Sequence, residues 1–292
     1  MACSKVRTRA VSAAAAIRRG TTPPQREKAL QVVDEVIKVV RAVARSEVMP
    51  RFLRVGKTRK EDGSLFTEAD LACQSALQQQ LPRILPHPVL GEEMTIEEQD
   101  ALWAANPDGL WVVDPIDGTT NFVNGLPYFA ISVALMINGR SELGVIYNPV
   151  SDEMFYARRG HGAFLNGQRL PLKSMANSMG DAIAAVEIKY LRSGKLAARM
   201  GSVAPFGSQR SMGSSTLDWC FLAAGRYDLY LHGGQRLWDY AAGAVILEEA
   251  GGRIASLNTD DYWADTVWKR SAIAALDTAL FAQWHRWVRA NQ

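Results

Sequence analysis

The sequence predicts an α+β fold in which helices enclose two β-sheets. Strand-like apolar segments joined by the turn pairs Asn138-Gly139 and Asn166-Gly167 fill the middle of the chain. From about residue 180, strands alternate with helices, so two layered sheets sandwiched by helices are expected. No repeat or low-complexity linker interrupts residues 27–292, and 292 residues are enough for a sizeable core. We therefore expect a single compact unit.

The N-terminal segment is the basic part of the chain. Residues 1–26 contain no acidic residue, and their basic residues are Lys5, Arg7, Arg9, Arg18, Arg19 and Arg26. We expect residues 1–25 to be a disordered basic extension, although their Arg, Ser and Ala content also resembles a transit peptide. The rest of the chain is slightly acidic, so the net charge of +3 gives no reason to infer nucleic-acid binding.

Cysteine usage and hydropathy favour a cytoplasmic protein without a membrane segment. Cys3, Cys73 and Cys220 are scattered, and no pair has the spacing of metal ligands. An odd, scattered set favours a reducing compartment. No apolar run approaches the length of a transmembrane helix.

Two helices are expected before the strands. The first begins at Thr22-Pro-Pro-Gln25, a capping-box spacing, and ends at Pro50. A charged, glycine-containing loop follows over 56–66, and the second helix runs over 68–81 until Pro82 stops it. The apolar face of the first helix comprises Leu30, Val33, Ile37, Val40 and Ala44.

The remaining elements divide the unit into two halves. An antiparallel-sheet half is expected over 26–178 and an α/β half over 179–292. The strands of the first half are expected at 131–137, 144–147 and 154–157. In the second half, strands are expected at 182–188, 227–231, 254–257 and 272–276, with helices at 214–224, 239–250 and around Trp284 and Trp287.

A short buried strand that ends in two carboxylates is the most specific feature of the sequence. Leu110 to Val113 are apolar, and Asp114 and Asp117 follow three residues apart. Carboxylates at the end of a strand suit a hard cation. Gly118 and Thr119 then open a helix, whose first backbone N–H groups are free to bind an anion. A magnesium-dependent enzyme acting on phosphates needs both parts.

Other acidic residues become informative only in combination. Taken alone, Asp70 in Thr67-Glu-Ala-Asp70 is better interpreted as a helix-capping residue. Glu92-Glu93 follows a short strand at 89–91 and reads equally as part of a solvated acidic loop. Asp239 stands where a helix begins, as a plain N-cap would.

Three blocks in this order resemble the inositol monophosphatase family of metal-dependent, lithium-sensitive phosphatases. They are Gly91-Glu-Glu93, Asp114-Pro-Ile-Asp-Gly-Thr-Thr-Asn-Phe122 and Trp238-Asp-Tyr-Ala-Ala-Gly243. The resemblance extends over roughly 27–290. It implies a layered α-β-α-β-α fold, of the type shared with fructose-1,6-bisphosphatase, and a homodimer.

The resemblance also implies how two or three Mg²⁺ ions would be held. Glu92 would bind two ions and Asp114 would bridge two. Asp117 and Asp239 would complete the shell of a second ion, and the carbonyl oxygen of Ile116 would ligate one. Glu93 would contribute near the outermost ion. All these ligand atoms are oxygens, which Mg²⁺ prefers.

Catalytic roles follow from the same resemblance. Asp70 and Thr119 would orient and deprotonate the attacking water, with Asp70 accepting a hydrogen bond from the Thr119 hydroxyl. Backbone N–H groups of Gly118 and Thr119 would hold phosphate oxygens. No cysteine or histidine nucleophile accompanies the motif, so we expect direct in-line attack by water.

Substrate choice is the point at which the sequence departs from the family. Inositol-selective members have a glutamate before the Trp-Asp pair, and His232 stands at that position here. This histidine could be structural; as a site residue it could donate to a hydroxyl or, partly charged, meet a second anion, an option that Arg236 favours. Ser215 and Asp239 are further candidates for substrate binding.

The predicted function is magnesium-dependent hydrolysis of a small polyol phosphate, with inositol 1-phosphate as the default substrate. Alternatives within the fold are 3'-phosphoadenosine-5'-phosphate, histidinol phosphate and fructose 1,6-bisphosphate. A nucleotide would need an aromatic or apolar platform for its base, and the sequence identifies none. An alternative of another class is a regulator that binds RNA or the transcription machinery. The intact acidic set favours catalysis.

Overall fold

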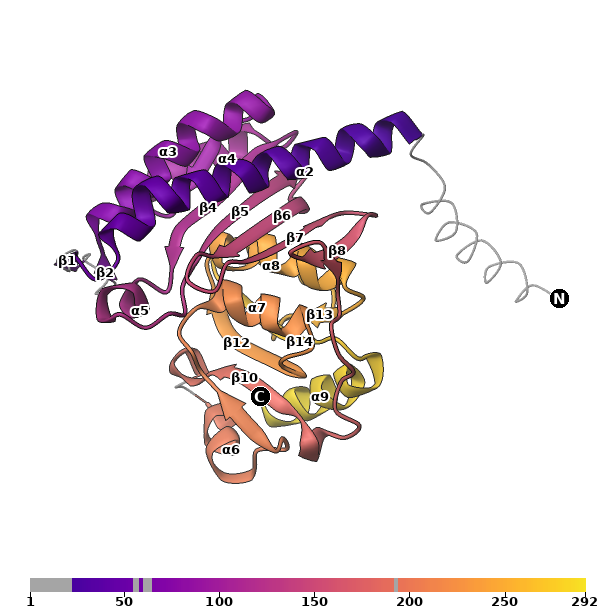
Figure 1. Ribbon diagram of the computed structural model, residues 1–292. Helices are drawn as coiled ribbons and strands as arrows, with labels where there is room; N and C mark the ends of the chain where they lie inside the picture. Colours follow the sequence, from indigo (N-terminus) through magenta and orange to yellow (C-terminus); the bar gives the residue numbers. More distant parts are fainter. Residues whose placement is uncertain (1–22, 55–57, 60–64, 192–193) are drawn as a thin grey trace.

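The computed structural model describes residues 23–54, 58–59, 65–191 and 194–292. Helices and sheets alternate in layers, in the order helix, sheet, helix, sheet, helix (Figure 1). Three clusters of buried apolar side chains fill the spaces between the layers. The predicted layering is therefore observed. The predicted extension over residues 1–25 falls almost wholly outside the described residues.

The first helical layer is formed by α2 (Pro23–Val43) and α3 (Glu68–Ile84). As predicted, Val33, Val40 and Ala44 are buried on one helical face. Pro50 does not end α2 directly, because a π-helical turn (Ala44–Val48) and a 3₁₀ turn (Met49–Arg51) continue the coil. Among the described residues, no helix has the length and apolar character needed to cross a bilayer.

The expected end of α3 was wrong, and one alternative for the acidic residues after Glu93 is excluded. Pro82 lies inside the last turn of α3, where it removes only one N–H group and the helix is about to end. The acidic stretch after Glu93 is not a loop, because Thr95 and Glu98 form a capping box that starts α4 (Ile96–Ala105). In the charged loop, β1 (Thr58–Arg59) pairs with β2 (Leu65–Phe66).

The first sheet has seven strands in the order β3-β4-β5-β6-β7-β8-β9. Only β3 and β4 are parallel, and the other neighbours are antiparallel. Positive φ angles at Asn138 (50°) and Gly139 (72°) match the predicted two-residue hairpin turn. The strands are β3 (Val89–Gly91), β4 (Leu110–Asp117), β5 (Ala130–Ile137), β6 (Arg140–Asn148), β7 (Glu153–Arg158), β8 (Gly162–Leu165) and β9 (Gln168–Arg169).

The middle layer consists of α7 (Ser215–Ala223) and α8 (Leu237–Glu249). Both helices are buried on almost every side because they are covered by a sheet on each face (Figure 1). Gly144 of β6 lets the sheet approach α8 closely, since a Cβ atom there would lie 2.5 Å from the carbonyl oxygen of Ala242. The two sheets are thus joined through α7 and α8.

The second sheet has five strands in the order β11-β10-β12-β14-β13. Strands β11, β10 and β12 are parallel, and β14 and β13 continue the sheet in antiparallel pairing. The helices α6 (Lys195–Val203) and α9 (Thr278–Asn291) form the outer layer. The strands are β10 (Ile183–Glu187), β11 (Ser208–Arg210), β12 (Leu229–Gln235), β13 (Arg253–Ala255) and β14 (Arg270–Ala275).

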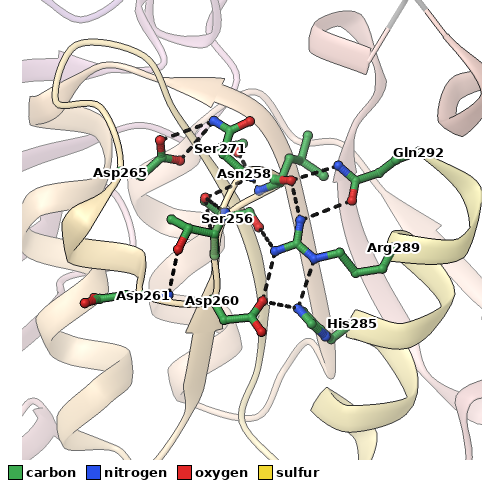
Figure 2. Close-up of polar contacts among 11 residues, drawn as sticks. Ser256, Asn258, Asp260, Asp261, Asp265, Ser271, His285, Arg289 and Gln292 are labelled. Atoms are coloured by element: carbon green, nitrogen blue, oxygen red, sulfur yellow. Dashed lines mark hydrogen bonds and ion pairs between the residues drawn. The ribbon is translucent and has the colours of Figure 1, made fainter.

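Arg289 fastens the C-terminal helix to the loop after β13 (Figure 2). Its guanidinium donates to the carbonyl oxygens of Ser256 and Leu257 and pairs with Asp260 at 3.0 Å. His285 contacts the same carboxylate at 2.8 Å. Hydrogen bonds from Arg289 and His285 hold the pKa of Asp260 below its usual value. This network therefore anchors α9 to the loop after β13.

Candidate metal and phosphate site

Three carboxylates that are distant in sequence converge at one point. Asp114, Asp117 and Asp239 each offer one oxygen, and these oxygens lie within 4.8 Å of one another. Asp114 is 1% exposed, and the other two side chains are half-buried. Asp114 and Asp117 come from β4 and the first sheet, whereas Asp239 comes from α8. The predicted ligand carboxylates of both halves therefore meet.

A β-bulge puts Asp114 and Asp117 on the same face of the sheet. Residues three apart on a regular strand point to opposite faces. Here Asp114 pairs with Ser132 and Asp117 pairs with Ala130, so three residue steps along β4 lie opposite two residue steps along β5. The extra residue is accommodated at Pro115-Ile116, and proline supplies no N–H to the ladder there. Both carboxylates thus face the layer that contains α8.

Asp117 is held by the start of α7. Its Oδ2 accepts hydrogen bonds from Ser214 Oγ at 2.6 Å, from Thr216 N at 2.7 Å and from Thr216 Oγ1 at 2.6 Å. Burial raises the pKa of Asp117, and these hydrogen bonds lower it in part. Because Oδ2 is committed to α7, Oδ1 is the oxygen best placed for a cation. Sequence reasoning missed Ser214 and Thr216 in this role.

Asp239 is the third residue of α8 and not its N-cap. Its Oδ2 accepts the backbone N–H of Arg236, which is the N-cap residue, at 2.8 Å. Ser132 of β5, the partner of Asp114, contacts the carbonyl oxygen of Trp238 at 3.4 Å. This contact fixes the start of α8 beside the end of β4, which brings Asp239 next to Asp114.

The three carboxylates destabilise one another as long as all are charged. Burial, followed by repulsion from Glu92 and Asp117, raises the pKa of Asp114 well above its usual value. Burial, followed by repulsion from Asp117 and Glu92, does the same to Asp239. A cluster of carboxylate oxygens with this mutual repulsion fits a hard divalent cation such as Mg²⁺, which would neutralise it.

Two glutamines position the loop that contains Glu92 and Glu93. Gln74 Oε1 accepts the N–H of Glu93 at 2.9 Å, and Gln99 Nε2 donates to the carbonyl oxygen of Gly91 at 3.0 Å. A Cβ atom at Gly91 would lie 2.1 Å from Gln74 Oε1, so a larger residue there would displace the Gln74 side chain from its bond to Glu93. Sequence reasoning missed both glutamines. The capping box of α4 is the signal that could have placed Gln99.

The hydrogen bonds described for Asp70 and for Thr119 are made with other residues. Asp70 is 1% exposed, and its Oδ2 accepts the N–H and the hydroxyl of Thr67, both at 2.7 Å. The Thr119 hydroxyl donates to the carbonyl oxygen of Ile116 at 3.0 Å, whereas the expected acceptor was Asp70. Asp70 contributes to the raised pKa of Asp114, so it lies close to the cluster. Its catalytic contact with Thr119 stays a prediction.

Gly118 joins β4 to the short helix α5 (Thr119–Asn124) in a left-handed conformation. Its φ is 92°, and a Cβ atom there would lie 3.0 Å from the Tyr128 carbonyl oxygen. Only glycine fits such a position without strain. The predicted binding of phosphate by the N–H groups of Gly118 and Thr119 is compatible with this turn.

The structure distinguishes between the alternatives left open for His232. Its side chain is 3% exposed, and Nδ1 accepts the N–H of Gly234 at 3.1 Å. Burial and the nearby Lys189 lower the pKa of His232 to about 3. The imidazole is therefore neutral, with its proton on Nε2, which disfavours the partly charged alternative and leaves the structural and hydrogen-bond-donor alternatives. Ser215, the other candidate, is the half-buried first residue of α7.

A separate groove contains none of the predicted site residues. It has a volume of about 930 Å³ and lies between β13 and α9, where Arg253, Phe281 and His285 are among its lining residues. The candidate site is therefore assigned from its converging carboxylates and not from the size of a cavity.

Comparisons with known proteins agree with this geometry. Residues 25–289 match the sequence profile of the inositol monophosphatase family. The chain is 37% identical over 205 residues to the Nus factor SuhB of Pasteurella multocida (strain Pm70), covering 69% of this chain and 75% of that protein. It is 34% identical over 203 residues to an inositol-1-monophosphatase of Mesorhizobium japonicum, covering 68% and 74%. The structure of the IMPase of Thermotoga maritima matches with a TM-score of 0.71 at 28% identity, covering 88% of this chain and 98% of that chain.

Proposed function

The chain belongs to the inositol monophosphatase family, and we propose that it hydrolyses a small phosphate monoester with two or three Mg²⁺ ions bound at its carboxylate cluster. The convergence of Asp114, Asp117 and Asp239 within 4.8 Å supports this proposal most directly. Glu92 and the Ile116 carbonyl oxygen would complete the ligand set. When bound, such cations neutralise phosphate charge and lower the pKa of water.

The protein groups around the cluster would position the reactants. Backbone N–H groups of Gly118 and Thr119 would hold phosphate oxygens at the turn after β4. The Thr119 hydroxyl would orient the attacking water, and Asp70 would accept the proton that this water loses.

Attack by water is favoured over a covalent intermediate. Cys73 and Cys220 are both buried, and burial raises the pKa of both thiols well above the usual value. Neither would form a thiolate near neutral pH. Cys73 instead contacts the Pro115 carbonyl oxygen at 3.4 Å, which supports the bulge between Asp114 and Asp117.

Inositol 1-phosphate is the default substrate, and the relative from Mesorhizobium japonicum is named for that activity. The test is release of phosphate by the purified protein from inositol 1-phosphate, fructose 1,6-bisphosphate, histidinol phosphate and 3'-phosphoadenosine-5'-phosphate. We expect release with Mg²⁺ and none in excess chelator. Equal release in chelator would overturn the proposal. Light scattering of the same sample tests the predicted homodimer.

A regulatory role is a second candidate, because the relative from Pasteurella multocida is named a Nus factor. In that case the chain would bind the transcription machinery through a surface separate from the cluster. The measurement is binding of purified RNA polymerase to the wild type and to Asp114→Asn. Equal, saturable binding by both would support a regulatory role, and no binding by either would remove it.

A further inference from the structure

Three parallel strands end at the edge of the second sheet that faces the carboxylate cluster. In open sheets, ligands bind in the crevice outside the carboxyl ends of parallel strands. The segment after β12 leads to Asp239, and the segment after β11 leads to Ser214, which holds Asp117. The segment after β10 is the 3₁₀ turn η4 (Ile188–Leu191). The topology therefore places η4 in the same group of loops as the segments that lead to Asp239 and Ser214.

Tyr190 of η4 covers His232. Their ring centroids are 4.6 Å apart, and the ring planes are inclined by 33°. The backbone of η4 is close to β12, since a Cβ atom at Gly233 would lie 2.3 Å from the Tyr190 carbonyl oxygen. Glu187, at the end of β10, pairs in register with His232. Tyr190 is nevertheless 51% exposed, so one part of its ring faces solvent.

Further exposed apolar side chains lie on the same loops. Met212 is 44% exposed and Ile188 is 39% exposed. The carbonyl oxygen of Met212 accepts a hydrogen bond at 2.7 Å from Asn121 of α5, the helix that begins at Thr119. Ser211 donates to Glu187 at 3.0 Å, which links this loop to the end of β10. Ile188, Tyr190 and Met212 therefore lie on neighbouring loops close to the phosphate turn, and we refer to these three exposed apolar side chains as the apolar lip.

The chemistry of the lip suits a flat ring better than a polyol. A polyol offers many hydroxyl donors, and an acidic side chain accepts hydrogen bonds from them. Here His232 is neutral and is covered by an aromatic ring. Lys189 Nζ lies 4.8 Å from the Tyr190 ring centroid. A cation on an exposed ring is a weak contact, and a stacked ring can replace it.

We propose that Tyr190, supported by His232 and flanked by Met212, is a specificity-determining residue that stacks on a flat ring in the leaving group of the phosphate ester. This rests on the proposed phosphatase function. The ring can belong to a nucleobase or to another aryl group, because both offer the same π-face. The aromatic platform that the sequence alone did not identify is Tyr190.

The test compares two classes of phosphate ester on the same variants. The ring substrates are 1-naphthyl phosphate and a nucleoside monophosphate, and the substrate without a ring is glycerol 2-phosphate. Tyr190→Ala is expected to raise KM for a ring substrate about tenfold, the size of a lost stacking contact. Its kcat should stay within about twofold, because no group of the carboxylate cluster changes. The kinetics with glycerol 2-phosphate should not change.

Two control variants separate stacking from loss of fold. Tyr190→Phe keeps the ring and should retain wild-type KM values. Tyr156→Ala removes a half-buried tyrosine that stacks on Phe164 in the other sheet, and it should alter no substrate ratio. Saturation-transfer NMR should detect the naphthyl ring on the wild type and on Tyr190→Phe, with a strongly reduced signal on Tyr190→Ala.

The outcomes distinguish this proposal from the proposed function. A loss confined to one ring substrate supports the proposal and identifies the source of the ring. An unchanged ratio of ring to non-ring kcat/KM in Tyr190→Ala contradicts it, while magnesium-dependent hydrolysis by the wild type keeps the phosphatase function. If the wild type releases phosphate neither from these esters nor from the substrates named under the proposed function, the phosphatase function itself is contradicted.

Discussion

The end of β4 and the apolar lip face the same site but are built in opposite ways. At β4, buried carboxylates repel one another, and their raised pKa values show that the charged cluster is unfavourable without a cation. At the lip, a neutral histidine and partly exposed apolar side chains impose no such demand. The carboxylate cluster therefore requires a bound cation, whereas the residues of the lip can differ according to the leaving group of the substrate. Variants of the two regions should have separable effects on kcat and on substrate ratios.

Asp114→Asn should have the largest effect. The substitution keeps the shape and removes a charge that would hold cations, so kcat should fall by about 10³-fold or more. Phosphate release at saturating Mg²⁺ is the measurement. Asp218→Asn is the matched control, because Asp218 is a buried acid that pairs with Tyr128 at 3.0 Å outside the cluster. A similar fall in kcat in both variants would show that the effect is not specific to the carboxylate cluster.

The stability of Asp114→Asn in chelator shows whether its fold survives. The pKa of Asp114 is raised in the folded state, so ionisation there opposes folding. This cost is absent below the unfolded pKa of about 3.9 and is complete above the raised folded pKa. Metal-free Asp114→Asn should therefore be more stable than the wild type near neutral pH, and the difference should vanish in acid. Lower stability than the wild type would mean that the kinetic loss reflects misfolding.

Thr119→Ala should lower kcat by about 10- to 100-fold with a smaller change in KM. The hydroxyl is proposed to orient the water in the transition state, so its loss should act on the chemical step. Thr120→Ala is the control, since it removes the next hydroxyl of α5, which is exposed. An unchanged kcat with a several-fold higher KM would make Thr119 a binding residue only.

Thr216→Val tests how the two halves cooperate. It removes one of the three hydrogen bonds to Asp117 Oδ2 and keeps the backbone N–H of residue 216. A lost hydrogen bond to a charged acceptor is worth about 1.5 kcal/mol, or roughly tenfold in kcat or Mg²⁺ affinity. Titration of activity with Mg²⁺ measures both. Wild-type kinetics would show that α7 does not position Asp117.

His232→Glu should have the smallest effect and act on selectivity alone. A glutamate accepts hydrogen bonds from polyol hydroxyls and removes the ring beneath Tyr190. The ratio of kcat/KM for inositol 1-phosphate over 1-naphthyl phosphate should rise about fivefold or more. Direct competition between the two esters measures the ratio. If it does not change, His232 has only a structural role.

The region that the sequence predicts well is the one whose residues are close in sequence. Strand, carboxylates, glycine and helix start all fall between Leu110 and Asn124, so local patterns suffice. The bulge at Pro115-Ile116 was not predicted, because it depends on pairing with β5. Neither was the contact of Ser214 with Asp117, which joins residues 97 positions apart.

The lip could not be predicted for the same physical reason. Ile188, Tyr190 and Met212 lie on loops after different strands, and only the order β11-β10-β12 brings these loops together. The short β11 and the helix α6 have weak sequence signals and were both missed. Sequence reasoning left the charge of His232 open, because burial and Lys189, which lower its pKa, are properties of the fold.

Direct binding of Mg²⁺ is the measurement that bears most closely on the carboxylate cluster. Calorimetric titration of the wild type, Asp114→Asn and Asp218→Asn with MgCl₂ separates binding from turnover. The convergence of three carboxylates predicts saturable binding by the wild type and by Asp218→Asn, and at least about tenfold weaker binding by Asp114→Asn. Equal Mg²⁺ affinity in all three proteins, or no binding by the wild type, would contradict the assignment of this cluster as the metal site.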